Sequence, residues 1–525
     1  MPKWKQRLRD FIIALSIGNL TYVRNWNELL TYTKEQAFFF RRPPGLQQSL
    51  ATALNVIALG LVIFLGIRLL RKIHTGSRWP LIPASLLIIP SAYSLWVVLI
   101  AKLALWAPRY NPEWFLPGLT SILVVTALVI LLSVIGIAVR WPAETLTFAS
   151  SVAITFAPLM LVEAAGVVFH RITDTPSVFE SPPLATKVQK EGAPTILWLL
   201  IDELDYRLLF VDRPKDIQLP EFDRFRAAAI NAEQATPPAK DTRESVPSLL
   251  SGKRFVATET EAPALFWGLP PRSTTRLRIT PEQSIFSSAR AAGLNTSVVG
   301  WYLPYCRIYA PVLSACTWYD SSTRIVVDNQ SFLKDMMIQG RAPFETKHFS
   351  PFTHSVLDNH RLELVPKMRG DIARILSQPS PGFVYIHHMA THTPYVYDRL
   401  TGGFTKRNDP VGGYVDALVW ADSVLRDIRQ TMEKAGTWNN AVVLVTADHS
   451  YRDSQKLDGK RDFRIPWMMK LPGQQRPEAY TAPLRTIITK KLLESIMAGD
   501  VRTMEQARTW IDENERRVAE DADRP

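Results

Sequence analysis

The sequence predicts two different parts, an N-terminal α-helical transmembrane bundle and a C-terminal α/β domain with a largely parallel central sheet. Long apolar runs are crowded into roughly the first 170 residues, while the remainder has the mixed polar and apolar texture of a soluble domain. In that remainder, short apolar runs alternate with helical patterns, which is typical of α/β domains. A chain of 525 residues is also too long for one ordinary hydrophobic core.

In the first part, residues 1–170, four segments are long and apolar enough to cross a membrane. A fifth candidate, residues 11–23, is short and contains Gly18 and Asn19, so it fits either a span or a helix in the membrane interface. No small-residue cleavage site follows it, and we therefore do not expect a removable signal peptide. The four clear spans are residues 50–70, 81–103, 115–139 and 146–169.

The formal net charge of +12 is explained by Lys and Arg beside these apolar runs, where they would meet anionic lipid headgroups. No basic stripe interleaved with aromatic residues occurs elsewhere, so we expect membrane lipids as partners and no nucleic acid. With five spans and the N-terminus inside, most flanking basic residues are cytoplasmic and the polar domain is external. Four spans with a cytoplasmic domain are the alternative. The cytoplasmic residues of the five-span arrangement are Lys3, Lys5, Arg7, Arg9, Arg68, Arg71, Lys72, Arg78 and Arg140.

Three further features bear on the surroundings of the chain. Residues 25–44 combine Trp26 with runs of Phe and Arg, the composition of a membrane–water boundary, and they predict an interfacial anchor. Glu163, at membrane depth, should face the bundle interior, in a structural pairing or in contact with a lipid substrate. The two cysteines, Cys306 and Cys316, fit either a small disulfide-closed loop in an oxidising compartment or two buried free thiols.

The second part begins after a stretch rich in Pro, Ser, Thr and charge, residues 171–193, which predicts a linker. The domain that follows, residues 194–500, should contain buried parallel strands, because its apolar runs are short and continuous. The charged tail, residues 501–525, predicts a solvated helix that frays at its end. The predicted strands are residues 195–201, 296–301, 383–387 and 441–446, and the predicted helices are residues 221–232, 284–292, 415–435 and 484–497.

Acidic residues follow the first predicted strand in the segment TILWLLIDELDY. Asp202, Glu203 and Asp205 gather where the strand ends, and carboxylates there suit a divalent cation whose charge offsets their mutual repulsion. Solvated loop residues or helix caps are the alternative interpretation.

Hydroxyl residues open the segment KDTRESVPSLLSG, residues 240–252. They precede Pro247 and an apolar turn, the pattern of a helix that begins at a site and presents backbone N–H groups to an anion. Thr242 or Ser245 could serve there as a nucleophile if a metal ion lowered the pKa of the hydroxyl. An ordinary Ser/Thr helix cap is the alternative.

Two segments carry histidines behind predicted strands. In AVVLVTADHS, a buried strand delivers Asp448 and His449 together, a compact pair of ligands for zinc or manganese, against the alternative of a cap and a surface histidine. In YIHHMATHTPY, His387, His388 and His392 are three of only nine histidines in the chain. Imidazoles crowded behind a strand favour proton transfer or anion contact.

In this order, the segments between residues 193 and 473 resemble the sulfatase-type branch of the alkaline-phosphatase superfamily, and an alkaline-phosphatase-like α/β fold is implied. In TRESVPSLLSG, the spacing from Thr242 to Gly252 matches the sulfatase signature whose first residue is catalytic. The beginning T-x-x-S-V-P is closer to membrane phosphoethanolamine transferases, whose Thr there is the nucleophile. TADHS is similar to the metal motif T-S-D-H-G, and RIPWMMKLPGQ resembles the segment after it. HHMATHTP is similar to H-Q-M-G-S-H-G-P of the transferases, which places His392 at their substrate-contacting histidine.

Three departures from these families limit what the resemblance implies. Formylglycine sulfatases mature a Cys or Ser at the nucleophile position and carry Arg four residues later, whereas this chain has Thr242 and Val246. Thr cannot give the formylglycine aldehyde, so a conventional arylsulfatase mechanism does not apply. IDEL replaces G-E-S, which leaves open whether Asp202, Glu203 or both hold the metal. Arg464 stands where relatives can have His, so a second full metal site is unsupported.

The resulting hypothesis is a metal-dependent phosphoester transferase or hydrolase. Asp202 and/or Glu203, with Asp448 and His449, would bind one divalent metal ion, in first place zinc or manganese and in second place calcium or magnesium. Thr242 would attack phosphorus to form a phospho-threonine, and His392 would position the ester or protonate the leaving oxygen.

The predicted location is the bacterial inner membrane, with the catalytic domain on the periplasmic side. Tethering near the bilayer favours a lipid-borne or glycan substrate, because it raises the local concentration of such molecules. Two other functions remain open. One is a sulfuric ester hydrolase that acts without formylglycine, and the other is a degenerate binding module without a metal ion.

Overall fold

The chain divides into two compact units in a computed structural model. The helical unit comprises Met1–Tyr32, Arg42–Ser177 and Arg324–Thr353, and the α/β unit comprises Thr33–Arg41, Val178–Thr323 and His354–Pro525. Each unit therefore includes one short segment from within the sequence of the other. The structure describes residues 2–30, 38–39, 45–73, 81–86, 89–92, 94–95, 98, 129, 132–173, 194–262, 265–320, 331–344, 356–405, 409 and 412–523.

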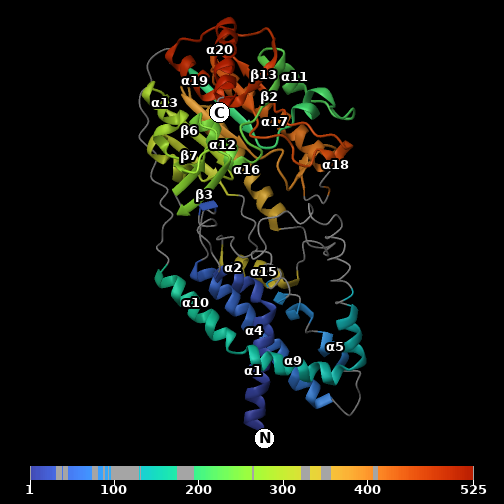
Figure 1. Ribbon diagram of the computed structural model, residues 1–525. Coiled ribbons are helices and arrows are strands. Elements are labelled where there is room, and N and C mark those ends of the chain that lie inside the picture. Colours follow the sequence, from blue (N-terminus) through green and yellow to red (C-terminus); the bar gives the residue numbers. More distant parts are fainter. Residues whose placement is uncertain are drawn as a thin grey trace. The chain divides into compact units, whose positions relative to one another are not determined.

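The helical unit contains the helices named below, drawn mostly in blue and cyan in Figure 1, and residues 89–92 and 132–140 are helical as well. Helix α9 ends just before Pro158 and α10 begins just after it, because proline lacks the N–H that would continue the helix. The helices are α1 (Lys3–Thr21), α2 (Val23–Leu30), α4 (Leu46–Ile73), α5 (Leu81–Leu86), α9 (Pro142–Phe156), α10 (Leu159–Thr173) and α15 (Phe332–Arg341), which is followed by a 3-10 turn, Ala342–Phe344.

Two stretches of the described residues are long and apolar enough to cross a membrane, Leu46–Lys72 and Pro142–Phe169. They contain the predicted spans at residues 50–70 and 146–169. The predicted span at residues 81–103 is described in pieces, at residues 81–86, 89–92, 94–95 and 98, and most of the span at residues 115–139 and of the linker at residues 171–193 lies outside the described residues. The number of spans therefore stays a prediction.

Helices α1 and α4 pack closely. A Cβ on Gly18 would lie 2.9 Å from the carbonyl oxygen of Val56, and one on Gly60 would lie 3.1 Å from the Cα of Leu15. Small residues at such a crossing are typical of helix pairs in membranes. Near the other end of α4, Arg71 forms an ion pair with the buried carboxylate of Asp10. The N-terminal part of α1 thus lies beside the C-terminal part of α4.

Glu163 is buried and paired. Its carboxylate accepts a hydrogen bond of 2.7 Å from the amide of Asn19, which itself accepts one of 2.9 Å from the indole of Trp26. The structural pairing predicted as one alternative for Glu163 is therefore confirmed.

The α/β unit is built on an eight-stranded sheet (Figure 1) with the order β13-β2-β12-β11-β1-β8-β6-β7. All neighbouring pairs are parallel except those made by β12. The sheet is therefore largely parallel, as predicted. Its strands are β1 (Thr195–Ile201), β2 (Ile230–Thr236), β6 (Thr296–Trp301), β7 (Ala315–Tyr319), β8 (Phe383–His388), β11 (Ala441–Thr446), β12 (Trp467–Lys470) and β13 (Glu478–Arg485).

The four predicted strands are confirmed as β1, β6, β8 and β11, the centre and one side of the sheet. Apart from Thr195, their residues are buried, because a parallel sheet is covered on both faces and its strands read as continuous apolar runs. Smaller sheets are formed by β3 (Ala257–Ala262), β4 (Leu265–Leu269) and β5 (Leu277–Arg278), and by β9 (Tyr397–Asp398) and β10 (Gly403–Phe404).

The longer helices of this unit form two sets, as expected for a sheet with helices on both faces. In one set α12, α13 and α19 contact one another, and in the other α17 contacts α11 and α16. Their bounds are α11 (Pro220–Arg226), α12 (Thr242–Ser251), α13 (Ile285–Ala291), α16 (Val356–Leu376), α17 (Gly412–Lys434) and α19 (Thr489–Ala498), and the short helical turns are Arg207–Val211, Pro281–Gln283, α14 (Tyr305–Ile308), Ala310–Val312, α18 (Gln455–Asp458) and Thr486–Ile488.

Two predicted helices are wrong at one end. The helix predicted for residues 221–232 ends at Arg226, and β2 begins at Ile230, because that segment pairs with β12 and β13. The helix predicted for residues 484–497 begins only at Thr489, after β13. The tail is helical, α20 (Met504–Asp523), but it is not solvated all round, since Ala507 and Ile511 are fully buried.

Cys306 and Cys316 form a disulfide bond, so of the two alternatives left by the sequence the structure has the paired one. The interfacial anchor predicted for residues 25–44 is wrong at Phe38 and Phe39, because both side chains belong to the core of the α/β unit. The ring of Phe38 packs on Phe266, and its carbonyl oxygen accepts a hydrogen bond of 2.8 Å from Arg307.

Candidate active site

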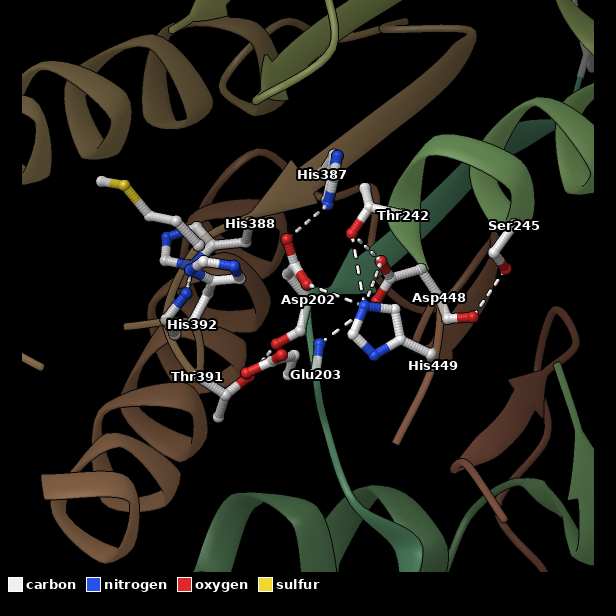
Figure 2. Close-up of polar contacts among 12 residues, drawn as sticks. Asp202, Glu203, Thr242, Ser245, His387, His388, Thr391, His392, Asp448 and His449 are labelled. Atoms are coloured by element: carbon white, nitrogen blue, oxygen red, sulfur yellow. Dashed lines mark hydrogen bonds and ion pairs between the residues drawn. The ribbon is translucent and has the colours of Figure 1, made fainter. Parts of the chain in front are cut away.

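Three neighbouring strands deliver the polar side chains of the site. In the order β11, β1, β8 the strands are parallel, so their carboxyl ends meet at one edge of the sheet. Asp202 follows β1, Asp448 and His449 follow β11, and His387 is near the end of β8. Residues that are far apart in the sequence are thereby brought together at the sheet edge (Figure 2).

Asp202, Asp448 and His449 form a buried group whose ligand atoms all lie within 4.8 Å of one another. The Nε2 atom of His449 lies 3.4 Å from Asp448 Oδ2 and 3.8 Å from Asp202 Oδ1. Neither carboxylate oxygen of Asp202 has a hydrogen-bond partner among the described residues. Such a buried carboxylate calls for a cation, and two carboxylates with one imidazole suit zinc or manganese. The residues present therefore fit a divalent metal ion.

Thr242 is the first residue of α12, and its hydroxyl faces this group. The hydroxyl donates a hydrogen bond of 2.6 Å to Asp448 Oδ2 and lies 3.3 Å from His449 Nε2. The first backbone N–H groups of a helix have no partner inside the helix and carry the positive end of its dipole. The hydroxyl thus lies at the positive end of the helix dipole and next to the candidate metal ligands (Figure 2).

Ser245, the other candidate nucleophile, points away from the group. Its hydroxyl donates a hydrogen bond of 2.6 Å to the backbone carbonyl oxygen of Asp448, as Figure 2 shows. This bond fixes the backbone that carries Asp448 and His449. Among the two hydroxyls that the sequence left open, Thr242 is the one in contact with the candidate ligands.

Glu203 contributes to the site in two ways. Its backbone has φ 61°, in the left-handed region, and its N–H donates a hydrogen bond of 3.1 Å to Asp448 Oδ1. Its carboxylate is 3.3 Å from the guanidinium of Arg452, outside the three-residue group that could hold a metal ion. The assignment of Glu203 as a ligand stays a prediction.

Arg452 is a cation next to the candidate ligands that the sequence analysis did not identify. One guanidinium nitrogen is 2.9 Å from His449 Nε2, and another is 3.4 Å from Asp241, the residue before α12. The Nδ1 atom of His449 is 3.0 Å from the carbonyl oxygen of Ser450 and donates to it, so Nε2 carries the lone pair. Arg452 therefore contacts the nitrogen that would coordinate a metal ion.

His387 occupies the opposite side of Asp202 from His449. Its Nε2 atom is 3.5 Å from Asp202 Oδ2, and its Nδ1 atom is 2.7 Å from the hydroxyl of Tyr305. Gly300 makes this contact possible, because a Cβ at this position would lie 2.2 Å from the Tyr305 ring. Burial lowers the pKa of His387 to about 4, so the imidazole is neutral at pH 7.

His392 lies apart from Thr242, on the other side of Asp202 in Figure 2. Its Nδ1 atom donates to the carbonyl oxygen of Thr393, 2.6 Å away, and its ring packs on Trp301 at 4.7 Å. Arg361 holds this loop through the carbonyl oxygens of Met389 and Thr393. Burial, and then the charge of Arg361, lower the pKa of His392, so its Nε2 atom is an unprotonated acceptor. Its role toward a substrate stays a prediction.

The carboxylates of the site are electrostatically strained without a cation. Burial and the charge of Asp448 hold the pKa of Asp202 well above its usual range, and burial and Asp202 raise that of Glu203. Burial also acts to raise the pKa of Asp448, but His449, His387 and the hydrogen bond from Thr242 outweigh it and lower this pKa. The group is therefore built to receive positive charge.

Two residues named in the sequence analysis have structural roles. Asp205 accepts a hydrogen bond from the backbone N–H of Leu208, and burial raises its pKa to about 6. Arg464 forms an ion pair with Asp462 and stacks on Tyr206. Neither belongs to the candidate metal group.

The sequence of residues 194–497, more than half of the chain, matches the protein family described as Sulfatase. Similar solved structures include the PsFucS1 sulfatase from Pseudoalteromonas sp., with 13% identity and a TM-score of 0.40 over 58% of this chain and 68% of that one. The phosphonate monoester hydrolase of Agrobacterium radiobacter has 13% identity and a TM-score of 0.39 over 58% and 74%. The lipoteichoic acid synthase LtaP from Listeria monocytogenes has 12% identity and a TM-score of 0.35 over 59% and 75%. These structural likenesses are too distant to assign an activity.

Proposed function

The chain belongs to the sulfatase family of the alkaline-phosphatase superfamily, and on this basis we propose that it is a membrane-anchored phosphoester transferase or hydrolase with Thr242 as nucleophile. The observation that carries the proposal is the position of the Thr242 hydroxyl, 2.6 Å from Asp448 and at the start of α12. The backbone N–H groups at the start of α12, the hydroxyl of Thr242 and the candidate metal group then lie next to one another. Group transfer through a covalent intermediate requires this arrangement of anion donors, nucleophile and metal ion.

In the proposed reaction, Thr242 Oγ1 attacks phosphorus of the ester, the Oγ1–P bond forms and the bond from phosphorus to the leaving oxygen breaks. The hydroxyl proton points at Asp448 Oδ2, which makes this oxygen the first acceptor for it. The backbone N–H groups at the start of α12 bind the phosphoryl oxygens. Water or an acceptor hydroxyl then attacks phosphorus, the Oγ1–P bond breaks, and Thr242 Oγ1 takes back the proton held by Asp448, while the departed oxygen takes its proton from water. A divalent metal ion bound by Asp202, Asp448 and His449 would supply Lewis acidity and lower the pKa of the hydroxyl.

His392 is proposed to act in the second half of this reaction. Its Nδ1 proton is committed to the carbonyl oxygen of Thr393, and its pKa is lowered, so the neutral ring offers Nε2 as an acceptor. That state suits uptake of a proton from the incoming hydroxyl better than protonation of the leaving oxygen.

A phosphoester is favoured over a sulfate ester because Thr242 cannot mature into formylglycine. A membrane anchor favours lipid-borne or glycan substrates at the bilayer surface, since the tether raises their local concentration. Two long apolar helices and the interface of small residues between α1 and α4 support membrane anchoring.

The side of the membrane is proposed from α15, which hydrogen-bonds to Gln48 and Thr52 in the first turns of α4. Arg71 and Lys72 lie at the other end of α4 and mark its cytoplasmic end by the positive-inside rule. The sequences that join α15 to β7 and to α16 are short and polar, so they do not cross a membrane. The catalytic part is therefore proposed to be periplasmic, and the disulfide of Cys306 supports an oxidising compartment.

The experiment that tests the proposal compares the intact protein with Thr242→Ala and Thr242→Ser variants on matched phosphate and sulfate esters. We expect phosphate ester turnover and a phosphorylated peptide containing Thr242, both absent in Thr242→Ala. Thr242→Ser, which keeps a hydroxyl, should retain part of both. Turnover of the sulfate ester alone would favour the sulfatase alternative, and full activity of Thr242→Ala would refute the nucleophile.

A further inference from the structure

Helix α15 is inverted relative to a helix on the surface of a soluble protein. The side chains that it turns toward α4 are polar, with Asp335 and Gln339 almost completely buried. Its outer side is apolar, with Leu333 67% and Met337 52% exposed, and Phe332 is exposed beside them. A helix on the surface of a soluble protein shows the opposite pattern, so the apolar side of α15 is unsuited to contact with water.

The polar side of α15 is held by specific hydrogen bonds. The Oδ2 atom of Asp335 accepts bonds of 2.7 Å and 2.9 Å from the amides of Gln47 and Gln48. Gln339 accepts a bond of 2.8 Å from the hydroxyl of Thr52. The amide of Asn55 also donates to the backbone of α15, at Met336. These bonds fix the rotation of α15 about its axis, and Leu333 and Met337 therefore face away from α4.

The apolar side of α15 continues an apolar surface on α4. The residues of α4 that hold α15 all lie in its first third, and Figure 1 shows α15, drawn in yellow, beside α2 and α4. In the same turns α4 exposes Leu50 and Leu54, and further along Leu61 and Val62, which are the lipid-facing candidates of the span Leu46–Lys72. The outer side of α15 thus borders the surface that faces hydrocarbon at one end of the span.

We propose that α15 lies in the membrane–water interface on the periplasmic side of the inner membrane, with Leu333 and Met337 at the boundary between headgroups and acyl chains. The occupant of its apolar side is the lipid bilayer, because the apolar surface is continuous with α4 and because the helix ends in the exposed Arg341, suited to anionic headgroups. This inference concerns a lipid contact made by an insert between β7 and α16, and it goes beyond the proposed reaction.

Spin labels on single introduced cysteines test the proposal in the intact protein, reconstituted in vesicles of phosphatidylethanolamine and phosphatidylglycerol. Both native cysteines are paired, so a label attaches only to the new thiol. Labels replace Leu333 and Met337, and the references are Val62 in the middle of α4 and Gln378 on the exposed surface of the α/β unit. Each label is measured for collision with oxygen, which concentrates in lipid, and with a water-soluble nickel chelate.

We expect labels at positions 333 and 337 to collide with oxygen severalfold more, and with the nickel chelate severalfold less, than the label at position 378. Their depth should lie between the values at positions 378 and 62. A label at 333 or 337 that is as open to the nickel chelate as the one at 378 contradicts the proposal, because the surface then faces water. Labels that are immobilised and closed to both reagents also contradict it, since another segment or a second copy of the chain then covers the helix.

Discussion

Buried carboxylates have different surroundings in the helical unit and at the candidate metal group of the α/β unit. In the helical unit, each of the buried acidic side chains Asp10, Glu163 and Asp335 has a hydrogen-bond partner, respectively Arg71, Asn19 and the pair Gln47 and Gln48. In the α/β unit, the equally buried Asp202 makes no hydrogen bond through either carboxylate oxygen among the described residues.

The difference separates packing from function. A buried carboxylate with hydrogen-bond donors fixes the position of the elements that carry it, and its removal leaves those donors without an acceptor. A buried carboxylate without donors costs free energy, and it persists only where another interaction, such as a bound cation, compensates for it. Removal of the two kinds of buried carboxylate should therefore have opposite effects on stability.

The largest expected effect follows from Asp202→Asn. This change removes one charge from the candidate metal group, and we expect turnover to fall by about a thousandfold or more, because the transition state loses the charge that a metal ion would provide. The metal-free variant should nevertheless unfold at the same temperature as the metal-free wild type, or at a higher one, since the strained carboxylate is gone. Thermal unfolding after chelation, with turnover on the same preparation, measures both.

A lower unfolding temperature of metal-free Asp202→Asn would contradict this assignment, because Asp202 would then be a structural residue. The control is Asp205→Ala, since Asp205 is also buried and close in sequence but accepts a hydrogen bond from the backbone N–H of Leu208, which this change leaves without an acceptor. That control should unfold at a lower temperature than the wild type.

The next effect concerns the helical unit. Asp335→Ala should lower the free energy of unfolding by about 2–3 kcal/mol, because the amides of Gln47 and Gln48 lose their acceptor. Asp335→Asn keeps an acceptor oxygen and should lose about half as much. Turnover of a soluble ester should stay unchanged in both variants. Thermal unfolding in micelles measures stability, and a loss of turnover at wild-type stability would break the division between the two units.

The positions of the site residues could be predicted where they depend on parallel strands. Asp202 and the Asp448–His449 pair follow continuous apolar runs, and parallel pairing of β1 with β11 places the ends of such runs side by side. Thr242 was predictable as a helix start, although the choice between it and Ser245 needed coordinates, because both hydroxyls lie on the same helix.

Features that depend on contacts between distant segments could not be predicted. Strands β2 and β12 were missed because β2 contains polar residues and β12 is short, so neither gives a continuous apolar run. No helix was predicted at α15, and only its docking on α4 shows that the polar side chains of Asp335 and Gln339 are buried. Arg452 carries no pattern of its own, and its role rests on its distances to His449 and Glu203.

A smaller effect concerns metal affinity. Arg452 donates to His449 Nε2 and partly offsets the negative charge of Glu203, so it competes with a metal ion for the same atoms. Arg452→Gln should bind manganese or zinc about tenfold more tightly, since a repelling charge and a competing donor are removed. Arg452→Lys keeps the charge and should change affinity less. Calorimetric titration of the chelated protein with each metal measures this, and weaker binding in Arg452→Gln would show that Arg452 supports the metal site.

The smallest effect concerns His388, whose Nδ1 atom accepts a hydrogen bond of 3.1 Å from Ala390, whereas the Nε2 atom of the adjacent His387 makes no hydrogen bond among the described residues. Burial lowers the pKa of His388 to about 3, while an unfolded histidine has a pKa of about 6.5. Between these values the unfolded chain binds the additional proton, so the stability that neutral His388 contributes is lost as pH falls below 6.5.

At pH 5.5 this loss should be about 1 kcal/mol, and a His388→Gln variant, which keeps an acceptor for Ala390 and does not titrate, should lack it. The difference in unfolding free energy between wild type and His388→Gln, measured between pH 8 and pH 5, isolates the contribution of this residue. If the difference in unfolding free energy between wild type and His388→Gln does not change with pH, His388 takes up a proton equally well in the folded and unfolded protein. Burial in β8 would then not keep this imidazole neutral.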